Sequence, residues 1–89
     1  MSEPGFTWFP NIKSGQRVLV FIDAMMGSLS DLYGHVVDRE SMTEGQFFKV
    51  FDSREEALTW AKSNKPKEMS VIALLHDESK SEEYVPIDT

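Results

Sequence analysis

The chain has 89 residues, 40% hydrophobic and 27% charged, which is the composition of one ordinary globular domain. It contains no cysteine, which excludes a disulfide framework, thiolate metal sites and thiol chemistry. No apolar run reaches the roughly 18 residues of a membrane helix. The first residues also lack the basic and apolar regions of a signal peptide. We therefore expect a soluble cytoplasmic protein.

The net charge of −6 is concentrated near one end of the chain. Residues 77–89 hold five acids and one lysine, a net of −4, and residues 1–76 carry the remaining −2. A nucleic-acid-binding protein needs a concentrated basic face, so we do not expect nucleic acid as a partner. The charge distribution predicts a single globular domain over 1–76 and an acidic, flexible tail over 77–89.

The first part of the chain, residues 1–15, contains two prolines and two glycines and predicts an extended arm. Phe6, Trp8 and Phe9 fall within four positions of this arm. Their rings either cover the core or form an exposed aromatic surface for a protein partner. Together with Tyr84, near the other end, they are the candidate partner-binding residues.

Two continuous apolar runs, 16–26 and 69–75, predict strands. Neither run alternates between apolar and polar residues, which is typical of a strand covered on both faces. A third strand is predicted over 46–51, where Lys49 in the middle of the run indicates a position nearer the edge of the sheet.

A helix is predicted over residues 53–64. Ser53 and Glu56 have the spacing of a capping box at its start. Asn64 is a candidate for a left-handed residue at its end, and Pro66 prevents the helix from continuing.

Residues 28–42 have two interpretations. A helix capped by Ser28 would place apolar side chains on one stripe: Leu29, Leu32, Tyr33, Val36 and Val37. A hairpin, in which 32–38 returns antiparallel to the first strand, is the alternative, because Gly34 and the paired valines disfavour a helix. We favour the helix.

The order is then strand, helix, strand, helix, strand. It predicts an α/β fold with a small, three-stranded, mostly parallel sheet, right-handed crossovers and an extended N-terminal arm. The hairpin interpretation predicts instead an α+β fold, in which one helix lies across an antiparallel sheet.

The candidate ligand-binding residues are Asp23, Gly27 and Ser28. Asp23 lies near the carboxyl end of a buried strand, where ligands bind in open α/β sheets. The amides of Gly27 and Ser28, at the start of the favoured helix, could hold an anion. The two histidines, His35 and His76, have no metal-ligand spacing, and we expect no catalytic set, metal or cofactor.

The segment Val20-Phe21-Ile22-Asp23, followed by Gly27-Ser28-Leu29, resembles the strand-to-helix turn of STAS-type domains, the anti-sigma-factor antagonist family. The run from Phe48 to Trp60 is similar to a later strand and helix of STAS-like relatives, so the resemblance covers about 16–64. It implies an α/β topology and the binding of a protein partner. The signalling members carry a phosphorylatable serine directly after the aspartate, where this sequence has Ala24.

These observations predict a non-catalytic regulatory or adaptor module that acts through protein–protein contact. A homodimer, paired through an exposed edge strand, is one form of that contact. The alternative function is a small-ligand or anion-binding domain that uses the turn at 23–28.

Overall fold

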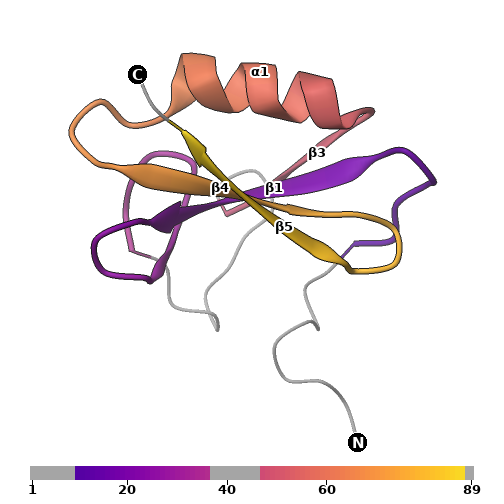
Figure 1. Ribbon diagram of the computed structural model, residues 1–89, viewed down its shortest axis with the longest axis horizontal. Helices are drawn as coiled ribbons and strands as arrows, with labels where there is room; N and C mark the ends of the chain where they lie inside the picture. The colour runs from indigo at the N-terminus through magenta and orange to yellow at the C-terminus, as the bar shows by residue number, and fades with distance from the viewer. Residues whose placement is uncertain (1–9, 37–46, 88–89) are drawn as a thin grey trace, which may run out of the picture.

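The computed structural model describes residues 10–36 and 47–87 (Figure 1). These residues form five strands and one helix: β1 (Arg17–Asp23), β2 (Leu29–Ser30), β3 (Lys49–Phe51), α1 (Arg54–Asn64), β4 (Val71–His76) and β5 (Glu82–Ile87). The described strand pairs are all antiparallel, and α1 lies over one face of the sheet (Figure 1). The fold is therefore α+β.

The sheet is built around β1 and β4, in the order β2-β1-β4-β5. β1 pairs with β4 over six positions, and β4 pairs with β5 over six more. The other edge of β1 is shared by two short strands, since β3 pairs with residues 17–19 and β2 pairs with Phe21 and Ile22. β1 and β4 are thus the central strands.

The predicted α/β fold with a mostly parallel sheet is wrong, and the alternative α+β antiparallel sheet with one helix is confirmed. The parallel prediction depends on the idea that a strand covered on both faces belongs to a parallel sheet. β1 is covered on both faces, but α1 covers one of them, and Phe47 and Phe48 pack against the other. Two aromatic side chains beside β3 replace the second layer of helices that a parallel sheet would need.

Two hydrophobic clusters lie on the two faces of the sheet. Alternate residues of β1 divide between them, because successive side chains of a strand point to opposite faces. On the helix side the buried residues are Leu19, Phe21, Leu32, Ala57, Ala61, Val71, Ala73, Leu75 and Ile87. On the other side they are Val18, Val20, Phe47, Phe48 and Leu74.

The predicted helix over 53–64 is confirmed as α1. The hydroxyl of Ser53 accepts a hydrogen bond from the Glu56 amide at 3.1 Å, as the capping spacing predicts. The predicted left-handed conformation at Asn64 is wrong, because this residue stays helical and Lys65 follows with a φ of −62°. Instead, the Asn64 side-chain amide donates to the Trp60 carbonyl at 2.9 Å and so satisfies one of the last carbonyls of the helix.

The favoured helix over 28–42 is wrong within the described residues, which end at Val36 in this region. Leu29 and Ser30 form β2. The Asp31 carboxylate then accepts hydrogen bonds from the Tyr33 and His35 amides, at 2.8 and 2.9 Å. Aspartate that bonds neighbouring amides in this way competes with helix formation. The strand that returns along β1 is at 29–30, earlier than the hairpin interpretation places it.

The predicted tail over 77–89 is also corrected, because it contains β5. The Asp77 carboxylate accepts hydrogen bonds from the Ser79 and Ser81 amides and so forms the turn that joins β4 to β5. Pro86 lies in β5, an outer strand of the described sheet. A proline has no amide hydrogen to donate to a neighbouring strand, so it is found on outer strands.

Among the described residues, no helix is both long enough and apolar enough to cross a membrane.

Candidate functional site

The predicted ligand-binding residues lie in the tight turn between β1 and β2. The Asp23 carboxylate accepts hydrogen bonds from the Met25 and Met26 amides, at 2.9 and 3.1 Å. The Gly27 amide donates to the Asp23 carbonyl at 2.7 Å, and Gly27 has a φ of +73°. No helix begins at Ser28, so the geometric reason for an anion site at this turn is lost. That Asp23, Gly27 and Ser28 bind a ligand stays a prediction.

The predicted partner-binding residues are divided. Phe6, Trp8 and Phe9 lie outside the described residues. Tyr84 lies on β5 with 55% of its surface exposed, and its hydroxyl donates to Glu82 at 3.1 Å. Partial burial and the Glu82 carboxylate together raise the pKa of Tyr84.

The two histidines lie in different surroundings. The His35 ring is exposed beside Asp31, with Nδ1 3.3 Å from a carboxylate oxygen. His76 is only 1% exposed, and its Nε2 is 3.4 Å from Glu82 across the β4–β5 pair. Burial lowers the pKa of His76, although Glu82 and Asp77 act in the opposite direction. Within the described ranges, no three histidines or carboxylates are grouped as metal ligands.

Three loops meet at one end of the molecule, on the left in Figure 1: the β1–β2 turn, the loop after β2 and the α1–β4 loop. Gly34, with a φ of +98°, brings the loop after β2 against the α1–β4 loop. A Cβ at Gly34 would lie 3.0 Å from Pro66 Cγ and 3.3 Å from Met69 Sδ. The Lys65 ammonium donates to the carbonyls of Pro66 and Met69, which holds the α1–β4 loop in place.

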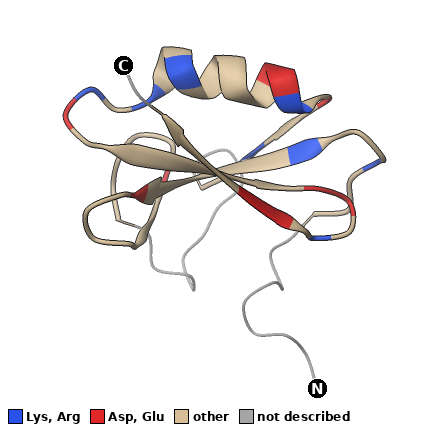
Figure 2. Ribbon diagram, viewed as in Figure 1, with Lys and Arg blue, Asp and Glu red and all other residues tan. Residues whose placement is uncertain are grey.

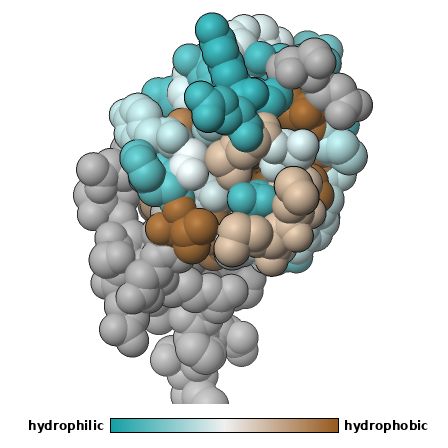
Figure 3. Space-filling view, turned by 90° about the vertical axis from the view of Figure 1, so that its left-hand side faces the viewer, coloured by the Kyte–Doolittle hydropathy of each residue, from teal (hydrophilic) through white to brown (hydrophobic). Residues whose placement is uncertain are grey.

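Large apolar side chains are exposed where these loops meet. Met25 is 88% exposed, Met26 70% and Tyr33 68%. They line two adjoining hollows of about 610 and 510 Å³, whose shared wall includes Met69. We name Met25, Met26, Tyr33, Pro66 and Met69 the loop-end surface. Figure 3 faces this end of the molecule and shows apolar surface gathered in the lower half of its described part.

Charged residues of both signs lie close together on the described ribbon (Figure 2). In the α1–β4 loop Lys67 is followed directly by Glu68, and both line the hollows of the loop-end surface. Arg54, the first residue of α1, and Glu83 on β5 form a bidentate pair with distances of 2.7–3.0 Å, which lowers the pKa of Glu83. In both places charges of opposite sign lie side by side.

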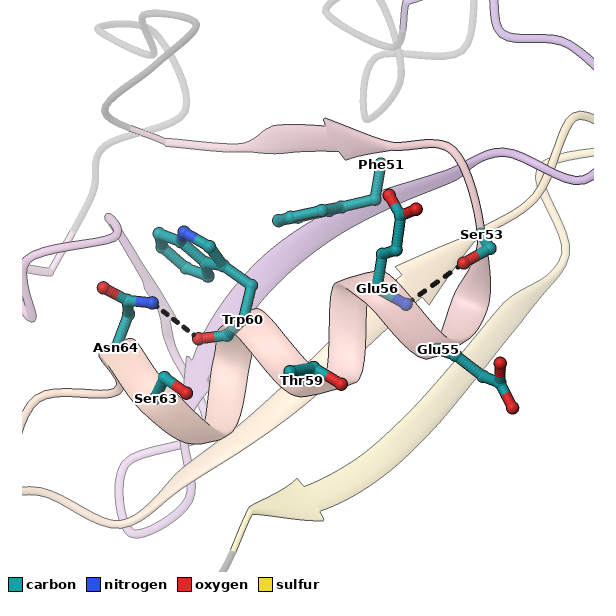
Figure 4. A pocket seen from close by; sticks show the side chains of 8 residues that line it. All are labelled: Phe51, Ser53, Glu55, Glu56, Thr59, Trp60, Ser63 and Asn64. Carbon is teal, nitrogen blue, oxygen red and sulfur yellow. Dashed lines mark hydrogen bonds between the residues drawn. The ribbon is translucent and has the colours of Figure 1, made fainter.

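A third hollow, of about 570 Å³, lies along α1 beside β3 (Figure 4). The rings of Phe51 and Trp60 stand together in it, with centroids 5.8 Å apart and planes inclined at 51°. The other lining residues are mainly polar and lie along α1 or just before it: Ser53, Glu55, Glu56, Thr59, Ser63 and Asn64. We name this hollow the aromatic groove.

Sequence reasoning missed both apolar surfaces. Met25 and Met26 continue the apolar run of β1, so they were indistinguishable from strand residues. Trp60 stacks on buried Phe21, with centroids 6.2 Å apart, and its ring also lines the aromatic groove. The available signal was Gly27, whose position after the methionines indicates that they belong to a turn.

Comparisons with models of protein families, with curated proteins and with solved structures find no match for this chain. The resemblance to STAS-type domains therefore remains untested. The antiparallel sheet differs from the α/β topology that the resemblance implies.

Proposed function

We propose that this protein is a non-catalytic regulatory or adaptor module that contacts another protein through the loop-end surface. The observation that carries the proposal is the exposure of Met25, Met26 and Tyr33 around two adjoining hollows. The same described residues bury 14 hydrophobic side chains in the core, so the exposed group is a local exception. A contiguous apolar patch on a small domain is typical of an interaction site.

The residue types suit a protein partner. Methionine is unbranched and polarizable and adapts to different apolar shapes. Tyrosine combines a large apolar ring with a hydroxyl, and it is enriched at the centres of interfaces. Lys67 and Glu68 supply the charged rim that surrounds such a centre. We propose that a partner inserts an apolar side chain between Tyr33 and Met69.

A photoreactive amino acid placed at Tyr33 tests the proposal in the cells that make the protein. We expect one discrete cross-linked adduct, which is lost when Met25→Ser and Met26→Ser are added. The matched control is the same photoreactive residue at Glu78, an exposed position in the β4–β5 turn. Equal adducts from both positions, or none from Tyr33, would contradict the proposal.

A second copy of this chain is one proposed form of partner, through β5. The strand is six residues long and exposes Tyr84, but Pro86 removes one backbone donor from it. Light scattering after size exclusion at micromolar concentration tests this form. A mass of about 20 kDa, reduced to 10 kDa by Tyr84→Lys, supports the dimer, and a monomer at all concentrations excludes it. The cytoplasmic location stays a prediction.

A further inference from the structure

The aromatic groove lies on the helix side of the molecule and is separate from the loop-end surface in its lining residues. We propose that it binds a proline-rich peptide in the polyproline II conformation, with a basic residue of the peptide beside Glu56. This inference does not depend on the proposed function of the loop-end surface.

The floor of the groove is a fixed pair of rings. Trp60 stacks on Phe21, which is fully buried, with planes 24° apart, and the Phe51 ring is also in contact with it, with centroids 5.8 Å apart. The indole is therefore held in place before any ligand arrives. Its partly exposed surface and the Phe51 ring form an inclined apolar wall (Figure 4). Pyrrolidine rings of a polyproline II helix dock on aromatic walls of this kind.

The Trp60 indole also supplies a hydrogen-bond donor. Figure 4 shows the indole nitrogen on the edge of the ring that is turned toward β3. Within the described part of the chain, the Trp60 N–H has no hydrogen-bond acceptor. A polyproline II peptide has no internal hydrogen bonds, so its carbonyls are free to accept from this donor.

The length of the groove matches a short peptide. Its lining runs from Ser53 to Asn64 along α1, and at 1.5 Å per helical residue this is about 16 Å. A polyproline II helix rises about 3.1 Å per residue, so about five residues of peptide fit.

An extended strand added to β3 is the competing occupant, and the register disfavours it. The Asp23 amide donates to Ser28, so residues 17, 19, 21 and 23 direct their backbone groups toward β2 and β3. Their partners Lys49 and Phe51 bond back to β1, and only Val50 of β3 directs its amide and carbonyl outward. One residue is too little for strand addition, whereas polyproline II recognition needs no ladder.

Charge gives the peptide a direction. In Figure 4 the Glu56 side chain extends from α1 toward Phe51, while Glu55 points away from the rings. Neither carboxylate has a salt-bridge partner within 4.0 Å among the described residues. A lysine or arginine at the end of the peptide would complement this end of the groove.

Titration of the ¹⁵N-labelled protein with the synthetic peptide Arg-Pro-Pro-Leu-Pro-Pro-Leu tests the proposal. We expect saturable shifts of the Trp60 indole N–H, with no comparable shift of the Trp8 indole. Trp60→Phe keeps an aromatic ring but removes the donor, and should weaken binding about three- to tenfold, as for one hydrogen bond. Circular dichroism checks that this variant is folded.

A second variant tests the contribution of the Glu56 charge independently. Glu56→Gln should weaken the arginine peptide about threefold and leave a glutamine-substituted peptide unchanged. Glu78→Gln, in the β4–β5 turn, is the matched control and should change neither. Three results would overturn the proposal: no saturable shift at millimolar peptide, equal binding of a peptide with alanine at every proline, or shifts centred on the Val50 amide. Each leaves the cross-linking test at Tyr33 unaffected.

Discussion

Residues 53–64 and 28–36 have similar apolar spacing and different structures. The first segment is α1, and its stripe buries Ala57 and Ala61 against the sheet. The second is β2 followed by a turn, and it leaves Tyr33 exposed. The difference lies in the polar residues. Ser53 caps a helix, whereas Asp31 accepts hydrogen bonds from amides of its own turn.

The comparison shows that apolar periodicity alone does not define a helix. Once Asp31 and Gly34 close a turn, the side chains of the stripe no longer share one face. Leu32 enters the core, but Tyr33 remains outside it and joins the loop-end surface. The same local chemistry that prevents the helix therefore produces the surface that we propose for binding.

The largest difference in stability is expected between substitutions of the aromatic residues in the two segments. Trp60→Ala should lower the free energy of unfolding by about 3 kcal/mol, because the ring packs on Phe21 and Phe51. Tyr33→Ala should change it by less than about 0.5 kcal/mol, as expected for an exposed side chain. Urea denaturation of both variants measures the difference. Similar losses would mean that Tyr33 is packed in the core.

Substitutions at two glycines test the contact between the loop after β2 and the α1–β4 loop. Gly34→Ala should cost about 2 kcal/mol, from its positive φ and from the crowding against Pro66 and Met69. Gly15→Ala has a similar φ of +93° with nothing within 4 Å of the new methyl group, so about 1 kcal/mol is expected. Thermal unfolding distinguishes them. Equal losses would show that the loops are not in contact.

Two serine substitutions compare how much each hydroxyl group contributes to the stability of the fold. Ser53→Ala should cost about 1 kcal/mol, since it removes the cap of α1. The buried Ser30 hydroxyl has no hydrogen-bond partner in the described ranges, so Ser30→Ala should be neutral or slightly stabilising. A loss at Ser30 equal to that at Ser53 would show that the Ser30 hydroxyl also has a hydrogen-bond partner. Chemical denaturation is again the measurement.

A further prediction concerns His76 and the dependence of stability on pH. Burial lowers the pKa of His76 in the folded protein below its unfolded value near 6.5. The unfolded chain then binds more protons, so stability should fall as the pH decreases from 7 toward 5.5, by at most about 1.4 kcal/mol per pH unit. Arg54 lowers the pKa of Glu83, and this shift affects stability in a separate pH range, below about pH 4.5.

Thermal midpoints measured between pH 5.5 and 7 test this dependence. His76→Gln should flatten the slope, because it removes the buried imidazole. An unaltered slope in His76→Gln would assign the dependence to other groups.

Part of the fold could be predicted from the sequence. The central strands, the third strand and the capped helix follow from local patterns that the structure retains, with bounds shifted by a few residues. The direction of strand pairing could not be predicted, because burial on both faces does not reveal whether a helix or side chains such as Phe47 provide the cover. The sequence does not predict β5, because its apolar residues Tyr84 and Val85 lie among acids.

The candidate sites were less predictable. Asp23 does end β1 in a turn, as its position suggests, but its carboxylate bonds local amides. The loop-end surface needs the α1–β4 loop to lie beside the two loops that flank β2, which are far from it in sequence. The aromatic groove needs Phe51 beside Trp60. Neither neighbourhood is visible before the chain is folded.

The central claim is that the loop-end surface is apolar and exposed in the folded protein. A soluble paramagnetic probe, with methyl-labelled methionine, measures this directly. We predict strong broadening of the Met25 and Met26 methyl signals and weaker broadening of the half-buried Met69 signal. Protection of Met25 and Met26 equal to that of Met69 would contradict the claim.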